Sequence, residues 1–306
     1  MTGMELSGNY YERCGREMLL RQFPALFPRM AIGLIGEGSE CFGFDDELSR
    51  DHDWGPSFCI WLQKEDFVRW GNEVQAAYDD LPDDWNGYPA RKATHQGKGR
   101  VGVLCAQDWY RYYTGAAEGP ETLQQWRRVP EAFLATASNG VVFSDPLGSF
   151  TTVRQKLLDF YPEDVRLKRI AARAAIMAQS GQYNLPRSLA RGDTVAATLA
   201  LAEFLRAGMS MVYLMNRRYA PFYKWMHRGM RGLPVLSRTY GLFENLGSSS
   251  LPESRKIVER ICALVVGELA RQELTARKDT FLEAHCKDVL EHIQDEELRQ
   301  SHVMEE

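Results

Sequence analysis

The spacing of apolar residues changes near residue 150. Before that point, short apolar runs bounded by glycine, proline or polar residues are typical of β-strands, while longer segments have helical spacing. The strands are predicted at residues 31–35, 58–62, 100–104 and 140–143. Helices are predicted at residues 64–78 and around 10–22. This half of the chain is therefore predicted to be an α/β or α+β domain with few strands.

After residue 150 the strand-like alternation disappears. Apolar residues recur three and four positions apart, which is typical of helices with one buried face. Five or six helices are predicted, at residues 153–160, 162–180, 193–216, 221–228, 233–243 and 253–275. We therefore predict an α+β chain, with an α/β domain at residues 1–150 and an all-helical bundle at residues 151–306. The acidic tail of the bundle, residues 282–306, is expected to fray.

Composition and charge exclude several classes of protein. The 306 residues suffice for two domains, and 44% apolar with 25% charged residues excludes a disordered chain or a fibre. The net charge of −4 gives no overall basicity of the kind that attracts nucleic acid. The longest apolar runs are shorter than the ~18 residues that span a bilayer, and no Cys-x-x-Cys pair occurs. We therefore expect a soluble cytoplasmic protein without a signal peptide, membrane segment, disulfide or zinc site.

Residues 33–56 have the residue types needed to bind a phosphorylated ligand. A predicted strand runs into Gly-Glu-Gly-Ser, where glycines let backbone amides approach an anion and Ser39 adds a hydroxyl donor next to Gly38. A helix starting at this point would direct its positive end toward the same anion. Asp51 and Asp53 follow, and in an extended strand residues two apart share a face at ~6.5 Å, so that both carboxylates can bind one or two divalent cations.

Each of these features has an ordinary structural explanation when it occurs alone. A Gly-Ser turn is a common loop, and Asp-X-Asp pairs occur in many solvated loops. Their order and spacing after a buried strand favour function, because a phosphate cradle with paired metal ligands is the minimum needed to handle a nucleoside triphosphate with Mg²⁺. His52, between the two aspartates, is expected to be a structural residue on the opposite face of the strand.

The same segment resembles the signature of the DNA polymerase β-type nucleotidyltransferase superfamily, in which Gly-Ser is followed by Asp-X-Asp. Gly38, Ser39 and Gly43 match the first part of that signature, and Asp51 and Asp53 match the second. A helical C-terminal half is also typical of relatives in this superfamily.

Three segments resemble the bacterial DUF4037 proteins more closely. They are residues 38–56, 161–165 and 214–225, and together they span about residues 30 to 235. This resemblance extends the likeness beyond the short nucleotidyltransferase signature and into the helical half.

The resemblance to nucleotidyltransferases implies a mixed sheet with flanking helices and a defined reaction. Gly38 and Ser39 would hold the triphosphate, and Asp51 and Asp53 would hold two Mg²⁺ ions. A substrate hydroxyl would attack the α-phosphate in line, and pyrophosphate would leave. The predicted function is thus Mg²⁺-dependent transfer of a nucleoside monophosphate from a nucleoside triphosphate to a hydroxyl acceptor.

Two departures from the superfamily pattern keep a second hypothesis open. Active members carry a third carboxylate on a later strand, where this chain has Gly102. Asp108 is assigned to this catalytic role instead, although its position also suits a helix N-cap, and Asp145 stands in a sequence typical of a turn. Glu40 follows Ser39 where many relatives have a basic residue, and it would repel phosphate. The alternative is therefore a catalytically weak or inactive nucleotide-binding module; a third hypothesis is a structural interaction protein.

Residues 216–225 form a second candidate region, at a predicted helix–turn–helix corner. Its cations could neutralise phosphates and its rings could stack on a base, and we assign Asn216, Tyr219 and Lys224 to nucleotide binding. The ordinary alternative is the end of one helix, rich in arginine, followed by a second helix that starts at Pro221.

Other motifs narrow the chemistry. Lys92, His95, Lys98 and Arg100 are more typical of a solvated loop than of a lid over the site. The Gly-x-Gly-x-x-Gly string at residues 97–102 leads into a strand instead of opening a helix, so it is rejected as a dinucleotide site, and no P-loop occurs. The acceptor stays open among an aminoglycoside-like drug, a protein hydroxyl and an RNA end, and the acidic net charge disfavours long RNA.

Overall fold

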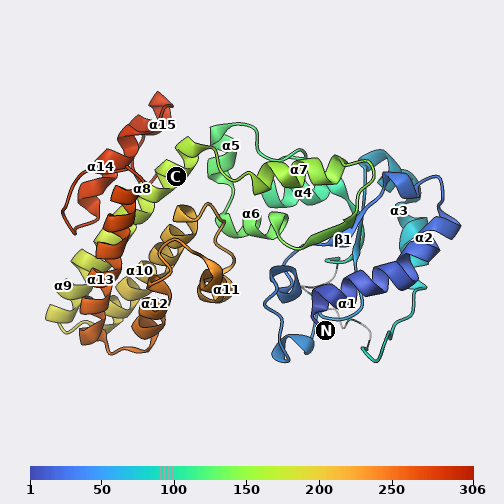
Figure 1. The fold of residues 1–306 in the computed structure, drawn as a ribbon, viewed down its shortest axis with the longest axis horizontal. Helices are drawn as coiled ribbons and strands as arrows, with labels where there is room; N and C mark the ends of the chain where they lie inside the picture. Colours follow the sequence, from blue (N-terminus) through green and yellow to red (C-terminus); the bar gives the residue numbers. More distant parts are fainter. Residues whose placement is uncertain (90, 92–93, 96, 98) are drawn as a thin grey trace. The chain divides into compact units, whose positions relative to one another are not determined.

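A computed structural model describes residues 1–306 except 90, 92, 93, 96 and 98 (Figure 1). The described residues form a four-stranded sheet of β1 (Ala31–Leu34), β2 (Cys59–Leu62), β3 (Gly102–Cys105) and β4 (Val141–Ser144). The strand order is β3-β2-β1-β4, in which β1 is antiparallel to β2 and β4, and β2 is parallel to β3. The four predicted strands and the α+β class with a mixed sheet are confirmed.

Helices from the first 160 residues flank this sheet. They are α1 (Gly3–Tyr10), the π-helical η1 (Tyr11–Gly15), α2 (Arg16–Gln22), α3 (Lys64–Asp79), α4 (Ala106–Thr114), α6 (Glu131–Ser138) and α7 (Ser149–Leu158). Three single 3-10 turns accompany them: η2 (Phe27–Arg29), η3 (Ser39–Phe42) and η4 (Leu48–Arg50). The opening helix therefore begins earlier than the sequence predicted, and α3 matches its prediction.

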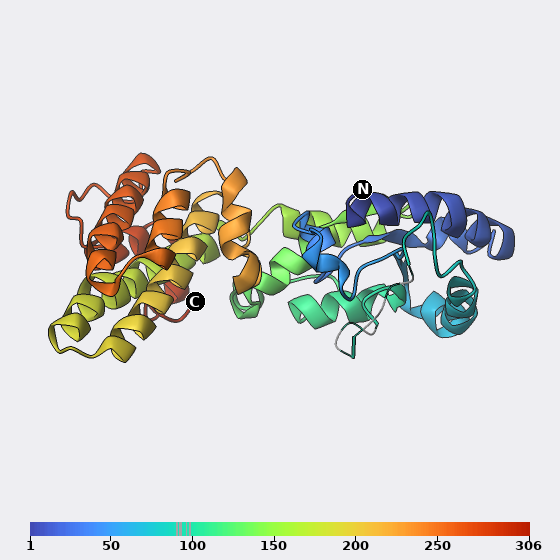
Figure 2. The ribbon, with the colours of Figure 1, turned by 90° about the horizontal axis from the view of Figure 1, so that it is seen from below.

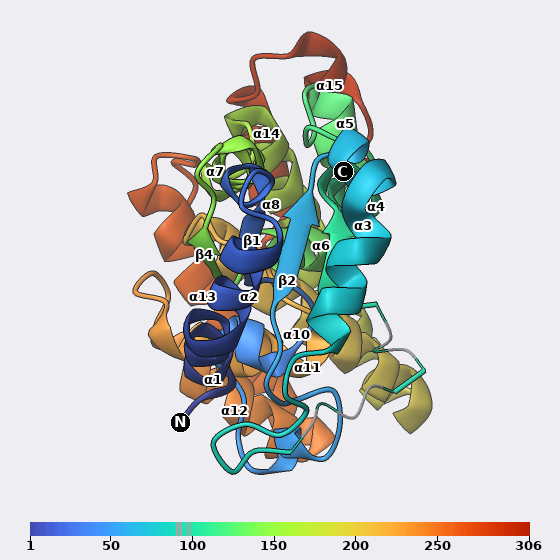
Figure 3. The same cartoon turned by 90° about the vertical axis from the view of Figure 1, so that its right-hand side faces the viewer.

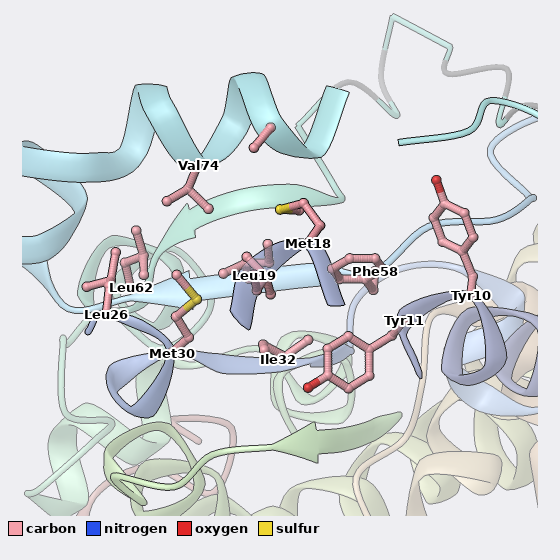
Figure 4. Packing of buried hydrophobic residues seen from close by; sticks show 12 residues of the cluster. Tyr10, Tyr11, Met18, Leu19, Leu26, Met30, Ile32, Phe58, Leu62 and Val74 are labelled. Carbon is pink, nitrogen blue, oxygen red and sulfur yellow. The ribbon is translucent and has the colours of Figure 1, made fainter. Parts of the chain in front are cut away.

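The side chains of β2 alternate between the two faces of the sheet, and each face is covered by a different layer of the structure. Phe58, Ile60 and Leu62 share one face because residues two apart in a strand project to the same side. Side chains of α1, η1, α2 and α3, of β1 and of the segment between α2 and β1 join them there (Figure 4): Tyr10, Tyr11, Met18, Leu19, Leu26, Met30, Ile32, Val74 and Ala77. Trp61 projects to the opposite face, where its ring stacks on Phe150 of α7 at 4.2 Å between centroids. Both faces of β2 are therefore buried.

The chain divides into two compact units. The first comprises residues 1–121 and 133–159, and the second comprises residues 122–132 and 160–306. The boundary predicted at residue 150 falls inside α7, the helix whose Phe150 packs on the sheet.

The second unit consists of helices and their connections (Figure 2). Its elements are α5 (Leu123–Arg128), α8 (Glu163–Met177), the π-helical η5 (Ala178–Asn184), α9 (Leu185–Ala190), α10 (Thr194–Met215), α11 (Tyr223–Gly229), the 3-10 turn η6 (Met230–Gly232), α12 (Thr239–Ser248), α13 (Leu251–Arg271), α14 (Glu283–Glu291) and α15 (Glu296–Gln300). α8 begins directly after Pro162, with two acidic residues in its first turn that favour the positive helix end.

The expectation that residues 282–306 fray is wrong. This segment forms α14 and α15, which pack on α8, and Leu282, Val289 and Ile293 are fully buried. The Nζ of Lys168, a fully buried residue of α8, donates hydrogen bonds to the carbonyl oxygens of Leu298 at 3.0 Å and Ser301 at 2.8 Å. The acidic composition concealed apolar residues at helical spacing, and these determine the packing.

α10 is, by length and composition alone, apolar enough to cross a membrane, and it alone passes that test among the described residues. The short apolar runs of the sequence did not reveal this, because isolated polar residues interrupt a helix that is apolar on average. In the structure α10 packs against α8, α9 and α13. A core helix of a helical bundle meets the same criterion.

Gly33→Ala is expected to lower the free energy of unfolding by about 1–3 kcal/mol. A Cβ at Gly33 would lie 2.4 Å from the carbonyl oxygen of Val141, so the backbone of β4 would have to move. Gly8→Ala in α1 is the matched control: its Cβ would meet Phe143 at an ordinary 3.6 Å, and helix propensity predicts a gain of up to ~1 kcal/mol. Urea unfolding of both variants checks this, and equal effects of the two changes would contradict it.

Candidate functional site

The strand directions place the predicted phosphate and metal residues at one end of the sheet. β2 runs away from this end (Figure 3), and β1, its antiparallel neighbour, runs toward it. Gly33 near the end of β1 pairs with Cys59 at the start of β2. The loop with Gly38 and Ser39 follows β1, and the segment with Asp51 precedes β2. We call the end of the sheet where β1 ends and β2 begins the site edge.

The glycine loop after β1 is held by the turn between α6 and β4. The side-chain amide of Asn139 accepts a hydrogen bond from the Gly36 N–H at 3.1 Å and donates one to the Gly36 carbonyl at 2.8 Å. Gly140 is required at its position, because its φ is +60° and a Cβ would lie 2.0 Å from the Leu34 carbonyl oxygen. Arg154 fixes this turn through hydrogen bonds to the carbonyl oxygens of residues 138, 139 and 140.

The helix expected to start at Ser39 is only the single 3-10 turn η3, with Gly38 as its N-cap. A turn of this length contributes little helix dipole, since the macrodipole grows from many aligned peptides. Gly38 and Ser39 are half-buried, and the Ser39 side chain makes no hydrogen bond to any of the described residues. The loop therefore offers a hydroxyl and backbone groups, without the helix end that the sequence predicted.

The carboxylate of Glu40 lies against Gly38, where a Cβ would come within 2.4 Å of its Oε1. Its side chain is buried, and its Oε1 lies 3.4 Å from Nη1 of Arg91, which in turn donates to Ser57 Oγ at 3.3 Å. Burial raises the pKa of Glu40, and the charge of Arg91 offsets part of that rise. The charge of Arg91 thus offsets part of the repulsion of phosphate expected from Glu40.

Asp53 differs from the expectation that it lies in an extended strand. Residues 51–53 form a bend, and Asp53 has a φ of +51°, in the left-handed region. Its two carboxylate oxygens accept hydrogen bonds from the backbone N–H and the hydroxyl of Thr94, at 2.9 and 2.7 Å. Arg100 Nη1 lies 3.8 Å from Asp53 Oδ2, and Arg100 Nη2 donates to Glu37 Oε2 at 2.6 Å. Arg100 thus connects the glycine loop with the aspartate segment.

Asp51 has a different environment from Asp53. Its carboxylate is exposed and lies 2.7 Å from Nδ1 of His52. Asp51 and His52 line a cavity of about 300 Å³ whose wall includes the rings of Trp54 and Tyr88. These rings meet edge-on at 5.5 Å, and Arg50 lies over the Trp54 ring. His52 therefore contacts Asp51 directly, although the sequence predicted it on the opposite face.

The carboxylates fit Mg²⁺ by chemical type, because Mg²⁺ prefers hard oxygen ligands. Partial burial acts to raise the pKa of Asp53, but the hydrogen bonds from Thr94 and the charges of Arg91 and Arg100 outweigh it, and the pKa lies below the ordinary 3.8. Asp53 is therefore ionised at neutral pH. Across the described residues, however, no three His, Cys, Asp or Glu side chains come together as a metal site, and Asp53 must exchange Thr94 for a metal ion.

Asp108 lies at the opposite end of the sheet. Because β3 is parallel to β2, Gly102 pairs with Cys59 at the site edge, whereas Cys105 pairs with Leu62 at the far end, just before Asp108. The structure therefore does not bring Asp108 together with Asp51 and Asp53. Its carboxylate binds Lys64 Nζ and Arg111 Nη1, each at 2.6 Å, and the hydrogen bond from Lys64 is the main cause that lowers its pKa. The N-cap of α4 is Cys105.

Asp145 also lies at the far end, because it follows β4, whose last residue Ser144 pairs with Ile32. It accepts hydrogen bonds from the N–H groups of Gly148 and Thr151 at 3.1 and 2.8 Å. This is the turn that its sequence predicted.

The corner at residues 216–225 belongs to the second unit. Asn216 is fully used structurally: its amide nitrogen donates to the carbonyls of Val212 and Val235, and its oxygen accepts from the Val235 N–H. Tyr219 is buried against the rings of Phe160 and Tyr161. Lys224 is exposed and lies over the Trp225 ring at 5.0 Å. Of the three predicted nucleotide-binding residues, only Lys224 is exposed at the surface.

Three residues of the site, Thr94, Glu37 and Asn139, could not be predicted from the sequence. Each forms a hydrogen bond with a residue more than 40 positions away, and no local motif marks such partners. Of the predicted basic loop, Arg100 lies at the site edge and His95 is exposed. Lys92 and Lys98 lie outside the described residues.

These features define an α+β protein with a mixed sheet in one unit and a helical second unit. Residues 126–226 match a family model described as "Domain of unknown function (DUF4037)". The predicted resemblance to DUF4037 is confirmed for this segment, which runs from α5 to α11 and does not include the site-edge residues Gly38, Ser39, Asp51 and Asp53. No curated protein and no solved structure matches the chain.

The pH dependence of stability is expected to reflect Glu40. A carboxyl whose pKa is raised on folding stabilises the protein fully below its unfolded pKa, and that contribution is lost as the pH rises through the folded pKa. The folded pKa of Glu40 lies above the ordinary 4.5. Between about pH 4 and pH 7, the stability of the wild type relative to Glu40→Gln should therefore fall, by ~1.4 kcal/mol for each unit of pKa rise.

Urea unfolding at a series of pH values measures this difference. Glu12→Gln, at an exposed position of η1 in the same unit, controls for the loss of a charge. A difference between wild type and Glu40→Gln that stays constant with pH would contradict the assignment.

Proposed function

We propose that the first unit is a Mg²⁺-dependent nucleotidyltransferase-like enzyme of the DNA polymerase β-type superfamily. It would transfer a nucleoside monophosphate from a nucleoside triphosphate to a hydroxyl acceptor. The observation that supports this most is the convergence of the Gly38-Ser39 loop and the Asp51–Asp53 segment at the site edge. The helical second unit agrees with the proposal, because a helical C-terminal half is typical of relatives in this superfamily.

The residues at the site edge have separate roles in this proposal. Ser39 donates its hydroxyl to a phosphate oxygen, and Arg100 neutralises phosphate charge once it leaves Glu37. Asp51 and Asp53 would hold Mg²⁺, which stabilises the attacking and leaving oxygens in phosphoryl transfer. The ionised state of Asp53 suits this role.

A specific observation favours the second candidate, a nucleotide-binding module without catalysis. Gly102 pairs with Cys59 at the site edge, where a third carboxylate would be needed, and Asp108 lies at the far end of the sheet. No described carboxylate is thereby assigned to deprotonate the acceptor hydroxyl. Binding supports both candidates, and only nucleotide transfer separates them.

Nucleotide binding is expected to raise the thermal stability of the wild type in the presence of Mg²⁺. A ligand at 100 times its Kd adds about 2.7 kcal/mol to the free energy of unfolding. Asp51→Asn/Asp53→Asn should lose the Mg²⁺-dependent shift, since the amides bind cations poorly. Asp108→Asn is the matched control, because it removes a carboxylate at the far end of the sheet and should keep the shift. The proposal fails if no nucleoside triphosphate shifts the wild type, or if Asp108→Asn abolishes the shift.

Transfer is measured with α-labelled nucleoside triphosphates and a panel of hydroxyl acceptors, by release of pyrophosphate and by label on the acceptor. The enzyme hypothesis predicts label transfer that Asp51→Asn/Asp53→Asn reduces by at least about 10²-fold, the scale seen when one preorganised electrostatic contact to a transition state is removed. Binding without label transfer to any acceptor or to the protein itself would favour the binding module.

A further inference from the structure

The second unit contains a cavity of about 420 Å³ formed by the start of α6, by α8 and α10, and by residues 220–226 leading into α11. Its wall includes Ile176, Phe222, Met226, Glu131, Arg173 and Ser210. Every residue of the wall except Glu306 lies within the segment 126–226 that matches the family model. The proposed nucleotide site does not use this cavity.

Arg173 is the central polar group of this cavity. Its Nε donates to Ser210 Oγ at 2.8 Å, its Nη2 lies 3.5 Å from Glu131 Oε2, and its Nη1 forms an ion pair with the Glu306 carboxylate. Ser210 Oγ also donates to Glu131 Oε2 at 2.7 Å. The side chains of Arg173 and Glu131 are each only 11% exposed. The guanidinium is therefore buried and fixed in orientation by two neighbours.

Glu306 supplies the third partner of this guanidinium from a distant part of the chain. Its other oxygen lies 3.7 Å from Nη1 of Arg169, so one carboxylate contacts two arginines. This side chain is 23% exposed, more than either Arg173 or Glu131. The position of the Glu306 carboxylate thus marks where the cavity binds an anion, and a carboxylate from solution has the same chemistry.

Glu131 offers a second binding point, which is negatively charged where Arg173 is positively charged. Its Oε1 is buried and has no hydrogen-bond partner among the described residues, although Oε2 has two polar neighbours. A buried carboxylate oxygen without a donor is unfavourable, so the cavity favours a ligand that brings an N–H group to this atom. An ammonium group satisfies the hydrogen bond and also compensates the negative charge.

The remaining wall is apolar. Ile176 of α8 and Met226 of α11 line it, and Phe222 adds an aromatic ring that is half exposed. A cavity of this volume lies within the ~300–1,000 Å³ typical of small-molecule sites, which combine an apolar wall with a few polar groups.

We propose that this cavity binds a small zwitterion, an α-amino acid with an apolar side chain. The carboxylate of the ligand takes the place of Glu306 on Arg173, its ammonium group donates to Glu131 Oε1, and its side chain contacts Ile176, Phe222 and Met226. Glu306 competes with the ligand, because both need the same face of the guanidinium. This site is independent of the proposed nucleotide site.

Calorimetric titration of the full chain with L-phenylalanine and L-methionine tests the proposal. Glu306→Gln removes the competing charge at a partly exposed position and should bind these amino acids about tenfold more tightly than the wild type, as expected when a competing state is removed. The ammonium and carboxylate are tested separately with 3-phenylpropanoate and 2-phenylethylamine, each of which should bind Glu306→Gln at least about tenfold more weakly than L-phenylalanine.

Two substitutions locate the binding. Arg173→Lys keeps the charge but loses the planar fork, and in the Glu306→Gln background it should weaken L-phenylalanine binding about tenfold or more. Arg206→Gln is the matched control: Arg206 also lines the cavity but is exposed and paired with Glu203, so binding should persist. Thermal unfolding of each variant verifies that it is folded.

Three results would overturn the proposal. The first is that neither amino acid binds the wild type or Glu306→Gln at millimolar concentration. The second is that 3-phenylpropanoate or inorganic phosphate binds as tightly as L-phenylalanine, and the third is that Arg206→Gln and Arg173→Lys lose binding equally. The second result would identify a simple anion site instead of a zwitterion site.

Discussion

β1 runs opposite to the other three strands, and this determines which residues of the first unit can act together. The end of β1 meets the beginnings of β2, β3 and β4 at the site edge, since β1 is antiparallel to β2 and β4 while β3 is parallel to β2. Segments that follow β1 or precede the other strands therefore gather there, whatever their separation in sequence. Segments that follow β3 or β4 end at the far side. This excludes Asp108 and Asp145 from the site on topology alone, before any side-chain conformation is considered.

Charge at the site edge is balanced by two arginines from the segment before β3. Arg91 is buried against Glu40, and Arg100 lies between Glu37 and Asp53. A phosphate that bound Arg100 would compete with the carboxylates, and a cation that bound Asp53 would weaken its attraction to the same arginine. Phosphate binding to Arg100 and metal binding to Asp53 would therefore each weaken the Arg100–Asp53 ion pair and so favour the other. This is a physical reason to expect nucleotide binding to depend on Mg²⁺.

The sequence predicted the strands and most helices because their signal is local: alternation or helical spacing within a few residues. That Gly102 stands where a third carboxylate is expected came from the resemblance to nucleotidyltransferases; the structure adds that Gly102 begins β3 at the site edge. The sequence did not predict the bend at Asp53, because the hydrogen bonds from Thr94 stabilise a left-handed conformation that residues 51–53 do not specify alone. The tail was also misjudged, since its burial depends on the contact of α14 with α8.

The corner at residues 216–225 shows how burial redistributes roles within one motif. Asn216 and Tyr219 have the chemistry to contact a ligand, but the loop after α10 uses the Asn216 amide to bind Val235 and packs Tyr219 against aromatic rings. The chain then changes direction at Pro221, and the residues around it line a cavity whose wall also includes Arg173 of α8. Composition indicated correctly that cationic and aromatic groups meet here. The cavity that some of them line also includes Arg173 and Glu131, 43 or more positions before Asn216 in the chain, so residues 216–225 could not specify it by themselves.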